Sequence, residues 1–406
     1  MNALPLAGVR IADFTWIGAG SFTTKMFSDF GADVIKIESQ QRLDSLRISR
    51  PFKDGKQGVN RSGYFSERNS NKRSITLNLK DERGQAIARR LIQRSDIVAN
   101  NFTPGTMEKF GLGYDAVRAI KPEIIYLAMS MQGATGPERD YLGYGLTIGA
   151  LTGLQFLSGL PGREPAGTGT NYPDHIPNPC HAAFAVLAAL RHLRRTGEGQ
   201  FIDVAQTEPT VSLLGPSVLD FTVNDRVQVR SGNEREHACP HGVYPCTGDD
   251  RWIAISVSSD SQWRALLQVL GSAQELESLA GASLQDRRRE AARIDEGIAA
   301  VTRGRSAEEL METLQRAGVP ASVVRNARDL VEDDAQLRHR QHWVSLDHAE
   351  MGRTLYGAPP YRMSDVGQVP TRAAPLLGEH TDEVLGSLLD LAAEEIDTLR
   401  TEGVLT

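Results

Sequence analysis

The chain has 406 residues, 40% of them hydrophobic, which is enough for two domains with a substantial core. Its formal net charge of -6 and scattered charges of both signs exclude a strongly basic surface for nucleic acid. Because no secretion signal or membrane-length apolar run is present, we expect a cytoplasmic protein that binds neither nucleic acid nor a membrane.

Residues 8–37 predict a strand, a turn, a helix and a second strand. Gly18 and Gly20 lie in the predicted turn, and Glu38 follows the second strand. In dinucleotide-binding domains, such glycines let the backbone approach a pyrophosphate, and an acid after the second strand holds a ribose hydroxyl. The third glycine of that motif is absent, because position 23 is Thr23. The segment therefore indicates either an NAD-dependent dehydrogenase or a tight turn of any doubly wound domain.

The alternation continues with strands expected at 74–79, 96–99 and 123–129 and a helix at 82–93. This pattern predicts a largely parallel sheet covered by helices on both faces. Ligands of such sheets bind at the carboxyl ends of the strands. The candidate ligand loops are 16–20, 69–73, 101–105 and 133–144. Their amides, aromatic rings and basic side chains suit a phosphate-bearing ligand with a flat base.

Asp174 lies in a proline-rich loop ahead of a strongly apolar helix. We expect Asn178 to cap that helix, Pro179 to be its first residue and Gly197 to end it. The apolar residues cover nearly all of its faces, which predicts burial. A carboxylate held ahead of a helix N-terminus is a candidate nucleophile, because the helix end favours the ionised form. The alternative is a turn aspartate that bonds its own backbone.

The three cysteines are Cys180, Cys239 and Cys246. An odd number without metal-ligand spacing indicates free thiols in a reducing compartment. His237 and His241 lie near two of them, but the spacing matches no standard closed zinc set. We therefore expect no metal site.

The pattern changes after Val204, and a second domain follows. The expected division is a large domain at 1–204, a linker at 205–224, a small domain at 225–335 and a return segment at 336–406 that completes the large domain. In the small domain, Ser306 and Glu309 predict a helix N-terminus, and Gly318 predicts its end.

Seven stretches in register resemble the class III CoA-transferases, the family of formyl-CoA, carnitine-CoA and benzylsuccinate CoA-transferases. The stretches are 31–38, 71–74, 101–105, Asp174 ahead of 188–190, 196–200 with Asp203, 231–233 with 240–244, and 378–381. They keep the family order over nearly the whole chain. The sequence of residues 172–179 is most similar to the benzylsuccinate branch.

The resemblance implies an α/β fold with a Rossmann-like large domain formed by both chain ends and a smaller α+β domain. It also implies two subunits interlocked as linked rings, either a homodimer or a heterodimer with a paralogous subunit. No cofactor would be bound permanently, and a coenzyme A thioester would be a substrate. CoA would pass from an acyl-CoA donor, succinyl-CoA, to a carboxylic acid, with benzylsuccinate or a related aromatic or dicarboxylic acid as the acceptor.

By the same resemblance, Asp174 is the nucleophile and forms an aspartyl mixed anhydride and then an aspartyl-CoA thioester. The positions that match CoA contacts of the family are Trp16, Ile17, Lys72, Arg73, Asn101, Phe102, Lys109 and Tyr144. Ser39 and Thr103 stand where relatives often have a basic residue. Residues 233–238 replace a glycine-rich loop of the formyl-CoA branch, which argues against oxalate as the acceptor.

Three other readings stay open. An alpha-methylacyl-CoA racemase shares the fold and uses a histidine and an acid, and His175 stands beside Asp174. An NAD-dependent dehydrogenase would use the glycines at 18 and 20. A CoA-binding subunit without activity would leave Asp174 idle.

Overall fold

The computed structural model describes residues 4–271 and 274–406. Residues 1–3 of the expected large domain and 272–273 of the expected small domain lie outside this range. The chain divides into two compact units, a large unit of Met1–Gln155, Thr168–Val227 and Gln336–Thr406 and a small unit of Phe156–Gly167 and Gln228–Ala335. The segment expected as a linker, 205–224, therefore lies within the large unit.

The large unit is built on a six-stranded sheet with the order β3-β2-β1-β4-β5-β6, and every neighbouring pair is parallel. The strands are β1 (Arg10–Asp13), β2 (Asp33–Glu38), β3 (Arg73–Thr76), β4 (Ile97–Asn100), β5 (Ile125–Ala128) and β6 (Gln200–Asp203). The prediction of a parallel α/β sheet is confirmed. This order places a topological switch point between β1 and β4, where doubly wound proteins bind ligands.

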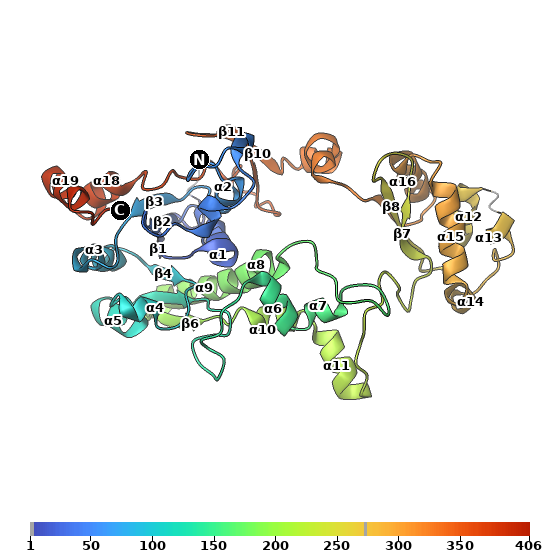
Figure 1. Ribbon diagram of the computed structural model, residues 1–406, viewed down its shortest axis with the longest axis horizontal. Coiled ribbons are helices and arrows are strands. Elements are labelled where there is room, and N and C mark those ends of the chain that lie inside the picture. Colours follow the sequence, from blue (N-terminus) through green and yellow to red (C-terminus); the bar gives the residue numbers. More distant parts are fainter. Residues whose placement is uncertain (1–3, 272–273) are drawn as a thin grey trace. The chain divides into compact units, whose positions relative to one another are not determined.

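Helices cover both faces of this sheet. Successive strand residues point to opposite faces, so neighbouring residues of β1 belong to different layers. Ile11 packs with α1 (Ile17–Asp29) and α9 (Pro177–Thr196). Ala12 belongs to the opposite layer, with α3 (Glu82–Gln93), α5 (Tyr114–Ile120) and α19 (Ala393–Thr401). The helices and the sheet can be followed in Figure 1.

The remaining elements of the large unit are short. They are η1 (Ser45–Ile48), η2 (Lys53–Gly55), α2 (Gly63–Arg68), α4 (Thr106–Lys109), α6 (Gly145–Leu151), α7 (Leu154–Leu157), α8 (Tyr172–His175), α10 (Thr207–Ser212), α11 (Gly215–Asn224), α17 (Ala335–His339), β10 (Trp343–His348), β11 (Gly352–Gly357), α18 (Thr381–Glu383) and η4 (Val384–Leu388), with α7 and α17 at the unit boundaries. Strands β10 and β11 form an antiparallel hairpin.

The small unit has an antiparallel sheet of β7 (His241–Pro245), β8 (Trp252–Ser256) and β9 (Ala321–Val323). Its helices are α12 (Asp260–Leu270), α13 (Gln274–Glu277), α14 (Leu284–Arg289), α15 (Ala291–Thr302), α16 (Ala307–Arg316) and η3 (Asp329–Asp333). All of them except η3 contribute side chains to the core around the fully buried Trp263. As predicted, Ser306 caps α16, since its hydroxyl accepts a bond from the Glu309 N–H.

The glycines at 18 and 20 lie inside α1 and not in a turn, because the helix begins directly at Ile17. A Cβ on Gly20 would stand 2.6 Å from the Cβ of Thr15 and 2.9 Å from the Cγ of Asn101. Glycine is therefore required here by close packing of the helix against two loops. The dinucleotide interpretation of these glycines is not favoured.

Helix α9 begins at Pro177, two residues earlier than predicted, and Asp174 lies in the short helix α8 rather than in a loop. Gly197 ends α9 in the left-handed conformation, as predicted. The expectation of burial on nearly all faces is wrong for the single chain, because Phe184 is 76% exposed. The buried residues of α9 pack against both the sheet and α1.

The C-terminal segment completes the large unit along β3. The His380 N–H donates to the Ser74 carbonyl (2.9 Å), and the Asn78 N–H donates to the Val404 carbonyl (2.8 Å). Asn71 anchors the chain before this segment: its Oδ1 accepts bonds from the backbone N–H groups of Thr371 (3.0 Å) and Arg372 (2.8 Å).

We expect Asn71→Ala to destabilise the protein by about 2–4 kcal/mol, because it removes all hydrogen bonds of a buried amide, including the one it donates to the buried Asp29 carboxylate, and puts alanine in a left-handed conformation. Asn71 has φ 62° and is buried. Urea unfolding measures the change. Asp54→Ala is the matched control, since Asp54 has φ 56° at an exposed position, where its ion pairs with Lys53 and Arg61 contribute little to stability. Equal losses in the two variants would contradict the anchoring role.

Among the residues that the structure describes, no helix is long and apolar enough to cross a membrane. Within the same part of the chain, no group of three or more His, Cys, Asp or Glu side chains is arranged to hold a metal ion. The three cysteines are free thiols, as predicted.

Candidate active site

A cleft of about 500 Å³ opens in the large unit at the carboxyl ends of the strands. Its walls are the segments that follow β1, β2, β3, β4 and β5, namely 14–19, 39–42, 77–80, 101–106 and 130–131, together with 141–144, Asp174 and Gln206. The volume falls in the range of small-molecule and cofactor sites. The cleft therefore lies where the sheet order predicts a ligand.

Six of the nine predicted site residues line this cleft: Trp16, Ile17, Asn101, Phe102, Tyr144 and Asp174. They come from four different segments, and the fold of the sheet brings them together. Lys72, Arg73 and Lys109 are not among the lining residues.

Asp174 is buried in the wall of the cleft, only 4% exposed. Its Oδ2 accepts a hydrogen bond from the N–H of Gly145, the first residue of α6 (3.2 Å). Burial raises the pKa of Asp174 to about 6, although the Gly145 N–H and the charge of Arg68 oppose the shift. The helix end that contacts this carboxylate therefore belongs to α6, and not to the following helix α9 as the sequence suggested.

Two glycines make room for this carboxylate. A Cβ on Gly145 would stand 2.8 Å from Asp174 Oδ2, and a Cβ on Gly18 would stand 3.2 Å from the Cβ of Asp174. The first turns of α1 and α6 thus approach Asp174 with bare backbone. An anionic group formed at Asp174 would meet the positive ends of two helices.

Both ring nitrogens of His175 contact other side chains of the protein and not the cleft. Its Nδ1 accepts a bond from Arg68 Nη2 (2.7 Å), and its Nε2 lies 3.5 Å from the Tyr64 hydroxyl. Burial, together with the charge of Arg68, lowers the pKa of His175 to about 4, so the ring is neutral at pH 7. His175 does not line the cleft. The histidine and acid pair of the racemase alternative is therefore not favoured.

The aromatic wall of the cleft is Trp16 and Phe102, whose rings meet edge to face at 5.5 Å. The guanidinium of Arg42 lies 5.3 Å from the centre of the Trp16 ring. Arg42 and Lys80 are exposed residues that line the cleft directly after β2 and β3. Sequence reasoning missed both of these cations. Their position just after a strand was the signal that could have found them.

Lys72 lies outside the cleft, because its side chain is buried against α1, where Nζ donates to the Ser21 carbonyl (2.9 Å). Its ammonium group is fully buried and ion-paired with Asp13 (3.1 Å), and it also donates to Thr24 and Asn69. Arg73 begins β3 and pairs with Asp33 and Glu383. Both cations hold the fold together.

Lys109 is exposed on the outer side of α4, while Thr106 and Phe110 line the cleft. Glu38 also borders the cleft, but its two carboxylate oxygens accept bonds from the buried Arg47 (2.7 Å each). It is therefore committed to an internal ion pair and is poorly placed to hold a ribose hydroxyl. The dehydrogenase alternative therefore lacks a free acidic residue to bind the ribose of the cofactor.

Comparisons with known proteins place this geometry in context. The family model described as CoA-transferase family III matches residues 6–381. The chain is 32% identical to the succinyl-CoA–L-malate CoA-transferase beta subunit of Chloroflexus aurantiacus, over 100% of this chain and 99% of that protein. It is 31% identical to the succinate–glutarate CoA-transferase of Agrobacterium fabrum, over 95% of this chain and 96% of that protein. A crystal structure of a CAIB/BAIF family protein from Brucella suis superimposes with a TM-score of 0.87 at 28% identity, covering 95% of this chain and 100% of that chain.

Proposed function

This chain belongs to CoA-transferase family III, and we propose that it moves CoA from succinyl-CoA to a dicarboxylic acid with Asp174 as the nucleophile. The observation that carries the proposal is the buried Asp174 carboxylate in the wall of a cleft of cofactor size. A fixed carboxylate beside helix N-termini is equipped for covalent catalysis.

In the first half of the reaction, an Asp174 oxygen attacks the thioester carbonyl of the donor. The C–S bond breaks, CoA leaves as the thiolate, and a mixed anhydride joins Asp174 to the donor acyl group. The thiolate then attacks the Asp174 carbonyl carbon of this anhydride. The donor acid leaves as its carboxylate, and Asp174 is held as a CoA thioester.

The second half runs the same steps in reverse with the acceptor. The acceptor carboxylate attacks the aspartyl-CoA carbonyl and displaces the CoA thiolate, which gives a second mixed anhydride. The thiolate attacks the acceptor's acyl carbon, so the acceptor leaves as its CoA thioester and Asp174 is a carboxylate again. A carboxylate suits this task because its anhydride keeps the acyl group activated, whereas a serine ester would not.

The chain's own groups supply positioning and charge stabilisation. The Gly145 N–H, 3.2 Å from Asp174 Oδ2, is placed to donate to the oxyanion formed at Asp174. In this proposal, the adenine of CoA packs against Trp16 and Phe102, and its phosphates lie near Arg42 and Lys80. The two cations replace the basic residues that the sequence lacks at 39 and 103.

The acceptor is proposed as a short dicarboxylic acid, because the relatives named above act on malate and glutarate. Benzylsuccinate is also a dicarboxylic acid and belongs in the same panel of acceptors, because the sequence of residues 172–179 resembles the benzylsuccinate branch. Rates with malate, glutarate and benzylsuccinate rank the three. The acceptor with the highest kcat/KM identifies the branch.

A second subunit is also proposed, either a copy of this chain or a paralogue. Large apolar side chains are exposed on α9 and α11, including Phe184, Leu187, Leu219 and Phe221. Exposed apolar faces of this kind are typical of subunit interfaces. One relative is itself named a beta subunit. Molar mass in solution, with and without a co-expressed paralogue, distinguishes the two arrangements.

The rate is expected to depend on the ionisation of Asp174. Since the carboxylate attacks and its pKa is raised to about 6, kcat/KM for succinyl-CoA should fall tenfold per pH unit below about pH 6 and level off above it. A pH profile measured after checking that the protein survives each pH tests this. A flat profile down to about pH 5 would contradict the assignment.

The decisive experiment traps the covalent intermediate. The protein is mixed with succinyl-CoA and then with hydroxylamine or borohydride, and peptides are mapped by mass in wild type and Asp174→Ala. A mass change confined to the peptide that contains Asp174, and absent from the variant, is expected. If no adduct forms although CoA binds, the transferase proposal falls. Deuterium exchange at the α carbon without an acceptor would then indicate a racemase.

A further inference from the structure

The backbone at the first residue of α1 is strained where it borders the cleft. Ile17 has φ 58°, a left-handed conformation that is a genuine outlier for a β-branched residue. The other non-glycine residues with positive φ in the described part of the chain are aspartates, an asparagine and a glutamine. Ile17 therefore has to be held in place by its surroundings.

Side chains from elsewhere in the chain hold this turn at consecutive backbone groups. The Thr15 carbonyl accepts a bond from Lys36 Nζ (2.6 Å). Asn101 bonds both the N–H and the carbonyl of Trp16 (2.7 Å each). The Ile17 N–H donates to Asp44 Oδ1 (3.1 Å). These side chains come from three different segments, so the turn is fixed by tertiary contacts.

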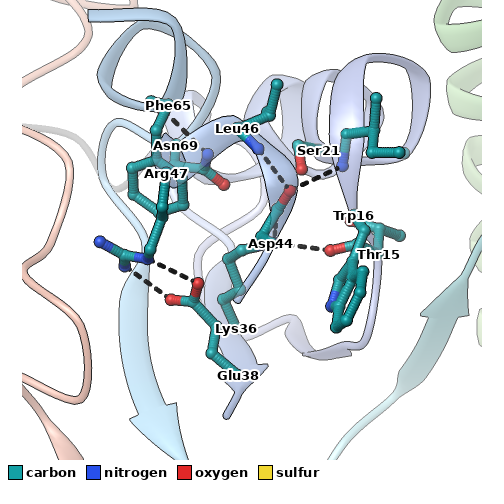
Figure 2. Close-up of polar contacts among 12 residues, drawn as sticks. Thr15, Trp16, Ser21, Lys36, Glu38, Asp44, Leu46, Arg47, Phe65 and Asn69 are labelled. Atoms are coloured by element: carbon teal, nitrogen blue, oxygen red, sulfur yellow. Dashed lines mark hydrogen bonds and ion pairs between the residues drawn. The ribbon is translucent and has the colours of Figure 1, made fainter. Parts of the chain in front are cut away.

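Lys36 and Asp44 are the charged part of this arrangement. They are ion-paired at 3.0 Å with both side chains fully buried, and Asp44 Oδ1 also accepts the Leu46 N–H (3.0 Å). Figure 2 shows Asp44 between Lys36 and the turn. Burial by itself lowers the pKa of Lys36, but the carboxylates of Asp44, Asp13 and Glu38 outweigh it and hold the ammonium charged. The paired charges thus clamp both ends of the turn.

We propose that the Lys36–Asp44 pair consists of positioning residues for the transfer reaction, which keep Ile17 left-handed so that Trp16 faces the cleft and Gly18 stays against Asp174. The inference rests on the proposed function for its kinetic consequence. Without the clamp, Ile17 relaxes toward negative φ. The Trp16 ring and the first turn of α1 then move relative to Asp174.

The test combines Asp44→Asn with Ile17→Gly. An asparagine cannot accept from both Lys36 and the N–H groups, because its NH₂ must face one set of donors. In Asp44→Asn we expect kcat and the rate of adduct formation to fall roughly 10²-fold, the loss that follows when reacting groups are misplaced by about an ångström. Glycine adopts positive φ freely, so Ile17→Gly should recover at least about tenfold of that loss. Lys36→Gln, which releases the Thr15 carbonyl, is the second variant.

Asp29→Asn is the matched control. It removes the charge of another buried carboxylate that pairs with a lysine, Lys25, at the far end of α1. It should keep the wild-type kcat, so that there is no defect for Ile17→Gly to relieve. If Asp44→Asn keeps the wild-type kcat, or if Ile17→Gly fails to relieve its defect, the inference is overturned.

A readout without turnover separates this inference from the proposed function. The emission of Trp16, taken as the difference between each protein and its Trp16→Phe version, should shift in Asp44→Asn and return in the double variant with Ile17→Gly. An unchanged Trp16 emission overturns the clamp. A shift with no transferase activity in wild type keeps the clamp and rejects the transferase.

Discussion

Asp174→Asn is expected to lower kcat for CoA transfer by roughly 10⁴-fold or more, the scale seen when a covalent nucleophile is removed. The amide fills the same space and still accepts the Gly145 N–H, but it cannot form the anhydride. The measurement is CoA release and acceptor-CoA formation at saturating succinyl-CoA. Asp140→Asn is the control, because Asp140 is exposed and does not line the cleft. A variant at 174 with more than about a tenth of wild-type activity would contradict the assignment.

The same substitution should raise stability at neutral pH. The pKa of Asp174 is about 6 in the folded protein against 3.8 for an ordinary aspartate, so the ionised carboxylate weakens the folded state above pH 6. At 1.36 kcal/mol per pKa unit the penalty is about 3 kcal/mol. The advantage of Asp174→Asn should therefore be full above about pH 6 and vanish as the pH falls to about 4. Urea unfolding at several pH values measures it, and an advantage that grows as the pH falls would refute the sign.

Gly145→Ala carries the second large expected effect. The added Cβ would stand 2.8 Å from Asp174 Oδ2 and 2.8 Å from the Cβ of Asn171. Asp174 or the start of α6 must therefore move, and we expect kcat to fall roughly 10²-fold. Stability should fall as well, because the Asn171 Cβ is not the end of a flexible side chain, and the preference of alanine over glycine in a helix offsets only about 1 kcal/mol. Single-turnover formation of the Asp174 adduct measures the effect directly.

The matched control is Gly215→Ala. Gly215 is also the first residue of a helix, α11, and a Cβ there meets nothing within 4 Å. It should keep wild-type kcat. If the two variants lose activity equally, the effect comes from helix N-termini in general and not from crowding of the nucleophile.

Local patterns predicted much of the large unit. The helix at 82–93 has the predicted bounds, because polar and apolar residues alternate with a clear helical period there. The strands near 74, 96 and 123 were found to within a few residues. The start of α9 was missed by two residues, since both Pro177 and Pro179 can occupy a first helical turn.

The residues of the cleft were harder to predict, because they depend on which segments lie at the carboxyl ends of the strands and on where their side chains point. Trp16 and Asn101 were identified by a family resemblance and do meet in the cleft. Lys72 was expected there too, but β3 begins at Arg73 and leaves Lys72 inside the sheet's polar core. The expected strand, 74–79, already began after Lys72. The miss came from the direction of its side chain, which runs beneath α1 to the Ser21 carbonyl and not into the cleft.

The alternation of strands and helices, the family resemblance and the candidacy of Asp174 could all be predicted from the sequence, because they depend on short-range periodicity and on motifs in register. The groups that surround Asp174 could not be predicted in this way, because they are set by tertiary packing. The hydrogen-bond donor of Asp174, Gly145, is 29 residues away in the chain, and the turn at Ile17 is held by Asp44 and Asn101 from other segments. Such contacts join segments that have no shared local pattern, and the packing of the parallel sheet brings them to one edge.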